Sequence, residues 1–291
     1  MGKKQALVYG RRAALAVAKN RPDDIERVLY QEGMPNRDLA PLLKACAQRR
    51  RPYRAVSATE LERASKSDHH EGVLVVTRLR KPIDFPDYLS RWSEHQSVSH
   101  KGAHSSASSH PSHKRHRQTP HKRLPIWVAL DRVDNDHNRG AIARSLAWFG
   151  GEGLIWEGRR PQLSGAALRI AQGAAEDIEL LAVSSMLAAL DELRARGVIV
   201  LGADQHEGQR SRSALSQPTH DVQRGICWVM GSERFGLSEP VKSRCDALVM
   251  IPGSGQVESL NVSVSAGILI TQSYHWLSEL GTDKLGSGDT R

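Results

Sequence analysis

The feature that most constrains this 291-residue chain is a polar stretch that separates two blocks of alternating apolar segments. From Pro86 to Arg123 the apolar periodicity disappears, and residues 93–113 contain eight Ser and five His. Such a composition is too polar to bury a core. The chain therefore divides into four expected parts: a domain over 1–82, a flexible basic linker over 83–123, a domain over 124–280 and a flexible tail over 281–291.

The net charge of +9 is distributed unevenly along the chain. Residues 1–81 hold 18 Lys and Arg against 9 acidic residues, and residues 82–123 hold 7 against 3. Residues 124–291 hold 16 against 20. A basic front half joined to a slightly acidic back half suggests that the front contacts a polyanion, most plausibly nucleic acid. A merely soluble basic surface is the alternative.

Localisation and metal content can be judged from what the sequence lacks. No stretch approaches the ~20 apolar residues of a membrane helix, and the start lacks the apolar run of a secretory signal, so we expect a cytoplasmic protein that contacts no membrane. The three cysteines are far apart, and the histidines of the linker are irregularly spaced. Neither set matches a zinc template, so no metal site is expected.

The front block alternates short helical and strand-like segments. Helical periodicity covers 11–20, 37–49 and 59–65, and strand-like runs cover 25–31, 53–57 and 72–78. This order predicts a small α/β/α sandwich around a mainly parallel sheet. Four arginines, which we expect to be exposed together, fall at one helix-to-strand corner: Arg49, Arg50, Arg51 and Arg54.

The back block continues the alternation over a longer stretch. Strands are expected near 126–131, 153–156, 178–183, 198–203, 225–230 and 247–251, with helices between them and a long closing helix over about 260–279. This pattern predicts a six-stranded parallel α/β domain. Ligands of such sheets bind at the carboxyl ends of the strands, so the chemistry should lie in the loops that follow them.

Three of these loops carry more polar residues than a turn needs. They are NDHNRGAIARS (135–145), GSERFGLSE (231–239) and IPGSGQVESLNVSVS (251–265). Taken singly, each has a structural explanation, because Asn138, Ser259 and Asn261 could cap helices and Glu233 could be a solvated turn residue. The dinucleotide, P-loop, metalloprotease and serine-hydrolase motifs are all missing, so spacing alone does not name a reaction.

Taken together, the three loops resemble the three motifs of the SpoU (TrmH-like) family of knotted RNA methyltransferases. The matching segments are N-x-G-A-x-x-R in Asn138 to Arg144, G-S-E-x-x-G-L in Gly231 to Leu237, and I-P…S-L-N-V-S-V-S in Ile251 to Ser265. Residues 8–81, with YGRRAAL and the HHEGV turn, resemble more weakly the L30e-like substrate-binding domain that precedes the catalytic domain in many members.

The resemblance implies an S-adenosylmethionine-dependent ribose 2′-O-methyltransferase of structured RNA, with ribosomal RNA slightly favoured over transfer RNA. It also implies a deep trefoil knot near the C-terminus and a homodimer formed through the C-terminal domain, in which each site borrows residues from the other copy. By position, the backbone around the cofactor would come from Gly231, Ile251 and Leu260.

The resemblance assigns catalysis to five positions: Asn138, Arg144, Glu233, Ser259 and Asn261. Arg144 would activate the ribose hydroxyl, but a guanidinium stays protonated in proteins, so we expect it to position the phosphate and stabilise the developing alkoxide. The RNA would be anchored by Arg11, Arg12, Arg49, Arg50, Arg51 and Arg54. The alternatives are a non-catalytic RNA-binding protein with the same fold and a methyltransferase that acts on base nitrogens.

Overall fold

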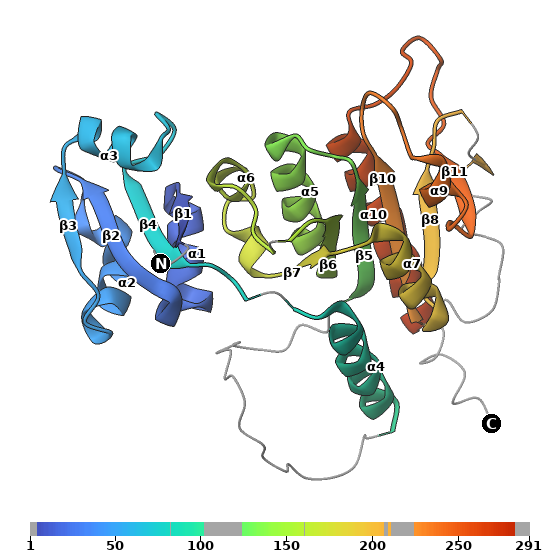
Figure 1. The fold of residues 1–291 in the computed structure, drawn as a ribbon, viewed down its shortest axis with the longest axis horizontal. Helices are drawn as coiled ribbons and strands as arrows, with labels where there is room; N and C mark the ends of the chain where they lie inside the picture. The colour runs from blue at the N-terminus through green and yellow to red at the C-terminus, as the bar shows by residue number, and fades with distance from the viewer. Residues whose placement is uncertain are drawn as a thin grey trace.

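The computed structural model describes residues 5–81, 83–101, 124–159, 161–206, 209–210 and 224–282. Two β-sheets lie side by side, each with helices on both faces, and the smaller sheet belongs to the N-terminal domain (Figure 1). Among the described residues, no helix combines the length and the apolar character needed to cross a membrane. The predicted two-part α/β architecture is confirmed.

The N-terminal domain is an α/β/α sandwich, as predicted. Its elements are β1 (Gln5–Tyr9), α1 (Arg11–Asn20), η1 (Pro22–Asp24), β2 (Ile25–Gln31), α2 (Asn36–Gln48), β3 (Tyr53–Val56), α3 (Ala58–Ser65) and β4 (Val73–Arg78). Alternate residues of each strand face opposite sides of the sheet. Val73 and Val75 pack in the same core as residues of α1 and α2, whereas Leu74 packs with Leu61 of α3 on the other side.

The prediction of a mainly parallel N-terminal sheet is wrong. The strand order is β1-β4-β2-β3, and only β2 and β3 run parallel, because β4 lies antiparallel to both β1 and β2. The loop before β4 holds Lys66, Glu71 and Gly72 at positive φ, which lets the short connection reverse the chain direction. β1 itself was not anticipated from the sequence.

The predicted linker is wrong in its first part, since residues Phe85–Lys101 form helix α4. Phe85, Tyr88, Leu89 and Trp92 are buried at the i, i+3, i+4, i+7 spacing of one helix face. Trp92 packs edge-on against Trp127 of the large sheet at a centroid distance of 4.8 Å. These few apolar positions are enough to dock the helix although polar residues surround them. The rest of the predicted linker, 102–123, lies outside the described residues.

The C-terminal domain is built on the parallel sheet that was predicted. Its strands are β5 (Leu124–Asp131), β6 (Gly151–Glu157), β7 (Glu179–Val183), β8 (Ile199–Ala203), β10 (Ile226–Gly231) and β11 (Ala247–Met250). Two residues, Gln209–Arg210, add a short edge strand, β9. The order is β7-β6-β5-β10-β8-β11-β9, with every neighbouring pair parallel. β5 and β10 therefore lie beside each other near the middle.

Helices cover both faces of this sheet. They are α5 (Asp136–Trp148), α6 (Gly165–Ile170), η2 (Ala174–Glu176), α7 (Met186–Ala195), α9 (Glu239–Lys242) and α10 (Val262–Thr282). Ile126 and Val128 share a core with α5, α6 and α10, whereas Trp127 and Ala129 share one with α4, α7 and α9. Both faces are apolar, as parallel strands require.

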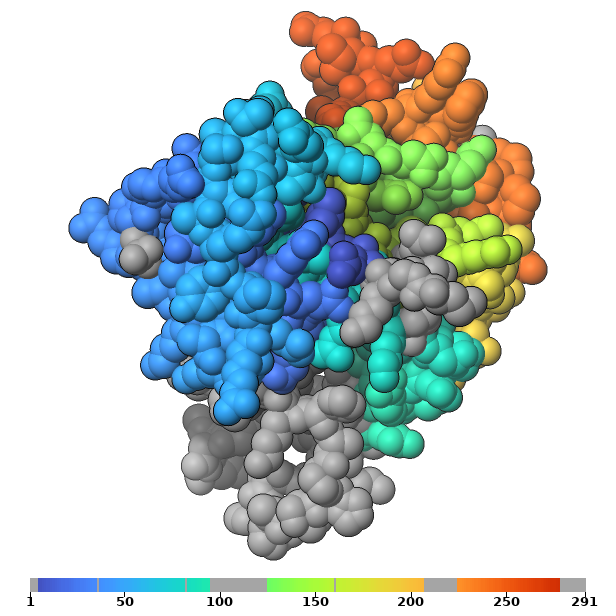
Figure 2. Space-filling view, turned by 60° about the vertical axis from the view of Figure 1, so that its left-hand side comes forward, coloured from blue at the N-terminus to red at the C-terminus, as the bar shows by residue number. Residues whose placement is uncertain are grey.

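The two domains are packed tightly together. Figure 2 shows the N-terminal domain directly against the C-terminal domain, and their apolar side chains join in one core. At the junction Glu176, 4% exposed, accepts hydrogen bonds from Arg21 at 3.0 Å and Arg80 at 2.6 Å. Burial acts to raise the pKa of Glu176, but the charges of Arg80 and Arg21 prevail and hold it below its ordinary value.

Candidate functional site

Three side chains form a hydrogen-bonded cluster beyond the ends of the central strands. One comes from each of the three polar segments 135–145, 231–239 and 251–265. Asn138 donates from Nδ2 to Glu233 Oε1 at 3.0 Å. Asn261 donates from Nδ2 both to Glu233 Oε1, at 2.7 Å, and to Asn138 Oδ1, at 3.1 Å. Each residue contacts the other two, although 123 positions separate Asn138 from Asn261. The expectation that these loops meet at one edge of the sheet is confirmed.

Asn138 reaches this cluster from inside helix α5 and does not cap it. Asn135 is the N-cap residue, and its side chain accepts a hydrogen bond from the amide of His137 at 2.8 Å. Asn138 is only 3% exposed. A buried amide side chain needs hydrogen-bond partners, and Glu233 and Asn261 supply them. The capping explanation for Asn138 is therefore wrong.

Gly231 ends β10 at a point where the chain folds back closely on itself. A Cβ added there would lie 2.2 Å from the carbonyl carbon of Gly236 and 2.4 Å from the amide nitrogen of Leu237. Only glycine permits this tight loop, which holds Glu233 in place. Gly231 is therefore required for the fold of the 231–237 loop.

The side chain of Asn261 also caps the start of α10. Its Oδ1 accepts hydrogen bonds from the amides of Ser263, at 2.9 Å, and Val264, at 3.4 Å. The capping expectation for Asn261 is thus confirmed, and the same side chain joins the cluster through its Nδ2. Ser259 is exposed and is not bonded into the cluster.

Arg144 does not reach the cluster within one chain. It lies six residues after Asn138 on α5, which places it about 9 Å along the helix axis and about 120° around it. Its side chain is exposed and makes no hydrogen bond or ion pair with any residue that the structure describes. Of the five predicted catalytic positions, three are therefore joined and two, Arg144 and Ser259, stand apart.

Asp131, which the sequence interpretation did not single out, stabilises the same edge of the sheet. This buried residue ends β5, and its Oδ2 accepts a hydrogen bond from the amide of Ser238 at 2.6 Å. Its Oδ1 lies 3.3 Å from Nε of Arg132. An acid at the end of an otherwise apolar strand was the signal that could have identified it.

The arginines predicted to bind RNA fall into two groups. At the end of α2, Arg49 pairs with Asp23 at 2.6 Å and Arg51 donates to the Asp23 carbonyl, so both are half-buried and not fully exposed as predicted. Arg50 is exposed, and Arg54 is exposed but pairs with Glu60. Arg11 and Arg12 begin α1 at the domain junction instead.

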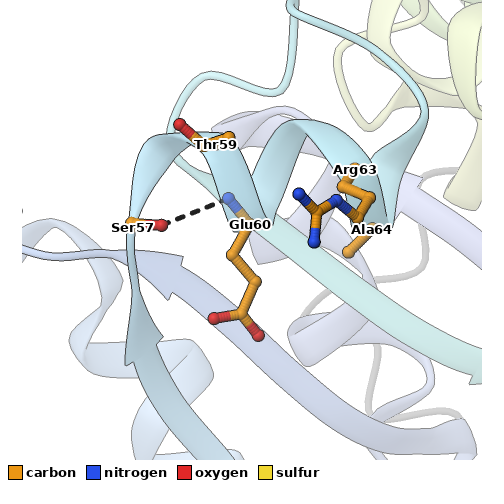
Figure 3. Close-up of a pocket in the computed structure, with 5 residues that line it drawn as sticks. All are labelled: Ser57, Thr59, Glu60, Arg63 and Ala64. Carbon is orange, nitrogen blue, oxygen red and sulfur yellow. Dashed lines mark hydrogen bonds between the residues drawn. The ribbon is translucent and has the colours of Figure 1, made fainter.

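The structure also has a cavity of about 420 Å³ on α3 (Figure 3). It is lined by the start of that helix and its next turn, and Ser57 accepts a hydrogen bond from the Glu60 amide there. This bond is the ordinary N-cap of α3. Among the described residues no group of His, Cys, Asp and Glu side chains could hold a metal ion.

Two family models account for the two domains. The model of the SpoU rRNA Methylase family matches residues 125–271, just over half of the chain. The chain belongs to this SpoU family. Residues 7–82 match the model described as RNA 2'-O ribose methyltransferase substrate binding. Both resemblances given by the sequence motifs are thereby confirmed.

Curated SpoU relatives match most of the chain. It is 28% identical over 272 residues to the 23S rRNA (guanosine-2'-O-)-methyltransferase RlmB of Neisseria meningitidis, which covers 92% of this chain and 94% of that protein. It is also 28% identical over 263 residues to the uncharacterized tRNA/rRNA methyltransferase YfiF of Escherichia coli O157:H7. That match covers 90% of this chain and 66% of YfiF, so YfiF is the longer protein.

Solved structures share the fold of this SpoU chain. The AdoMet-bound rRNA methyltransferase of Sinorhizobium meliloti superposes with a TM-score of 0.66, at 19% identity. The alignment covers 94% of this chain and 88% of that one. The alignment therefore spans both domains.

Proposed function

We propose that this chain is an S-adenosylmethionine-dependent RNA ribose 2′-O-methyltransferase that acts on ribosomal RNA. One observation carries the proposal: Asn138, Glu233 and Asn261, which lie in the three family motifs, are hydrogen-bonded to one another at the carboxyl edge of the sheet. Three separate turns would not require their side chains to be hydrogen-bonded to one another. The family membership and the similarity to RlmB support the same reaction and RNA class.

The loops around the cluster suit a cofactor held mainly by backbone groups. Between Ile251 and Leu260 the chain has no helix or strand, so its amide and carbonyl groups are free of regular pairing. Leu260 is 43% exposed and Val257 70% exposed, which leaves apolar side chains for a ligand to cover. Gly231, Ile251 and Leu260 would hold S-adenosylmethionine, which supplies the methyl group when bound.

The chain's own residues would align the ribose hydroxyl and stabilise charge. Glu233 Oε1 already accepts two amide hydrogen bonds, so we assign Glu233 to fixing the positions of Asn138 and Asn261. Arg144, a permanent cation, would bind the target phosphate and stabilise the alkoxide that forms as the hydroxyl loses its proton. We assign Ser259, which is exposed beside Leu260, to contact with the RNA.

Because Arg144 stands apart from the cluster, we assign it to the site of a second copy in a homodimer. Trp148 lies one turn further along α5, is 83% exposed and precedes Phe149, whose ring packs 5.3 Å from that of Tyr274 on α10. Exposed aromatic side chains of this kind are typical of protein interfaces. A partner that covers Trp148 would also lie close to Arg144.

Co-expression of two inactive variants, Arg144→Ala and Asn138→Ala, tests this assignment. Random pairing makes half of the dimers mixed, and each mixed dimer has one site with both native residues if Arg144 acts across the interface. Methyl transfer should then return to about a quarter of the wild-type rate. If Arg144 acts within its own chain, every site lacks one residue and activity stays at the level of the single variants. Sedimentation of the wild type checks the dimer directly.

Two further features follow from family membership and remain proposals. The C-terminal segment would form the trefoil knot of the family, and the protein would act in the cytoplasm. Resistance of the C-terminal domain to complete extension in a force experiment tests the knot. A non-catalytic RNA-binding protein is the competing function, and methyl transfer to RNA distinguishes the two.

A further inference from the structure

A cleft of about 690 Å³ lies where the N-terminal domain meets the end of α6, separate from the Asn138–Glu233–Asn261 cluster. Both domains line it. The start of α1, Gln31, Met34 and the loop before β4 form one side, and Arg169 and Gln172 form the other. Its volume is in the range of pockets that hold small ligands or single nucleotides.

Two guanidinium groups in this cleft are not neutralised by a carboxylate. Arg169 of α6 is half-buried and makes no hydrogen bond or ion pair with any described residue. Arg12 of α1 is exposed and, among the described residues, donates only to the neutral amide oxygen of Gln172, at 2.8 Å. A half-buried cation without a partner is costly, and a phosphate between two guanidinium groups is the usual way to satisfy it.

Two acidic residues, Glu71 and Asp68, also line the cleft. Glu71 accepts a hydrogen bond from the amide of Arg11 at 2.9 Å, and Asp68 lies 3.6 Å from the imidazole of His69. Arg11 in turn pairs with Asp38 at 3.2 Å. Among the described residues, Arg12 and Arg169, one from each domain, are the arginines of the cleft that form no ion pair.

The backbone around the cleft is held in a costly conformation. Glu71 and Gln172, which are not glycines, both have φ of 50°, a left-handed conformation that is costly for residues with a side chain. A side chain at Gly72 would lie 2.2 Å from Met34. Left-handed residues of this kind cluster at binding sites more often than chance allows. Glu71 and Gln172 lie on opposite walls of the cleft, one from each domain.

We propose that this cleft binds the phosphate of one unpaired nucleotide of the RNA substrate, gripped between Arg12 and Arg169. The proposal rests on the proposed function, because it assigns RNA as the ligand. The position suits an RNA strand that runs from the basic N-terminal domain towards the Asn138–Glu233–Asn261 cluster. Helix α6 packs on α5 close to Asn138, since a Cβ at Gly140 would lie 2.4 Å from the Ala167 carbonyl oxygen. Unpaired nucleotides are the part of RNA that such pockets can reach.

The test replaces each guanidinium by a methionine, which removes the charge and keeps an unbranched apolar stem. Arg169→Met and Arg12→Met should each weaken binding of in-vitro transcribed 23S rRNA about tenfold in a filter assay, the loss expected for one charge-assisted hydrogen bond. The slope of log affinity against log salt should fall by roughly 0.7 to 0.9. Arg63→Met, in the cavity of Figure 3, is the matched control and should bind as the wild type does.

Two outcomes would overturn the proposal. If both variants keep the wild-type melting temperature and the wild-type affinity, the cleft does not bind RNA. If adenosine monophosphate raises the melting temperature of the wild type but not of Arg169→Met, while RNA affinity is unchanged, the ligand is a free nucleotide. RNA binding is measured without methyl transfer, so the two proposals can fail separately. If the wild type transfers no methyl group but both variants bind RNA more weakly than the wild type, the proposed function is refuted and the proposed cleft is supported.

Discussion

Replacing Glu176 with Gln should loosen the junction between the two domains, because this carboxylate neutralises two guanidinium groups that are themselves mostly buried. The side chains of Arg21 and Arg80 are 12% and 16% exposed, and Glu176 is 4% exposed. Glutamine keeps the size of the Glu176 side chain and one of its acceptor oxygens, but it carries no charge. Arg80 would then lose its carboxylate partner, and Arg21 would keep only the more distant Asp24, at 3.7 Å.

The expected cost follows from this geometry. Breaking a buried ion pair by removing one partner lowers the free energy of unfolding by about 3–5 kcal/mol. Because Gln can still accept one hydrogen bond, we expect Glu176→Gln to cost about 3 kcal/mol. For a chain of this size, that loss lowers the Tm by roughly 6 °C or more. A surface pair would contribute about 1 kcal/mol at most.

The effect should depend on pH in one direction. The pKa of Glu176 in the folded protein lies below its ordinary value of 4.5. The stability from its ionised form is therefore fully present above pH 4.5 and is lost as the pH falls through the lower, folded-state pKa. The difference in Tm between wild type and Glu176→Gln should be constant near neutral pH and should shrink below pH 4.5.

Differential scanning calorimetry over a pH series measures both quantities. Glu60→Gln is the control, since Glu60 also pairs with an arginine, Arg54, but at exposures of 42% and 63%. The reasoning is refuted if Glu176→Gln costs no more than Glu60→Gln, or if its effect does not change with acid.

Two other substitutions test the site and the domain boundary. Gly231→Ala should weaken S-adenosylmethionine binding at least tenfold in calorimetry, because the new Cβ would collide with the backbone of Gly236. Gly267→Ala lies outside the proposed cofactor loops, and its new Cβ would be 3.8 Å from the Ser145 hydroxyl, so this control should bind normally. Leu89→Ala should cost about 2–4 kcal/mol in urea unfolding, since Leu89 is fully buried. A cost under about 0.5 kcal/mol would mean that α4 does not belong to the folded domain.

Much of the C-terminal domain could be predicted because its local signals agree with one another. Long apolar strands such as IWVALD alternate with helices, and parallel strands bring their following loops to one edge. The position of Glu233 after β10 and of Asn261 before α10 followed from that rule alone. The interactions of Asn138 could not, since capping and burial are equally compatible with an Asn near a helix start.

The errors have physical causes. In α4 four residues are buried among those whose side chains are described, and the Ser and His residues that follow them in the sequence obscured the helical period. In the N-terminal domain the direction of β4 depends on positive-φ residues in its preceding loop, Glu71 among them, which sequence does not reveal for non-glycine types. The separation of Arg144 from the cluster is a matter of helix phase, visible only once the start of α5 is fixed.

The most direct test of the account is methyl transfer from isotope-labelled S-adenosylmethionine to total unmodified cellular RNA, which is then separated by size and digested to nucleosides. The account predicts label on the ribose of ribosomal RNA. Label on a base would contradict the assigned reaction, and no label, despite measurable binding of cofactor and RNA, would show that the chain binds RNA without modifying it.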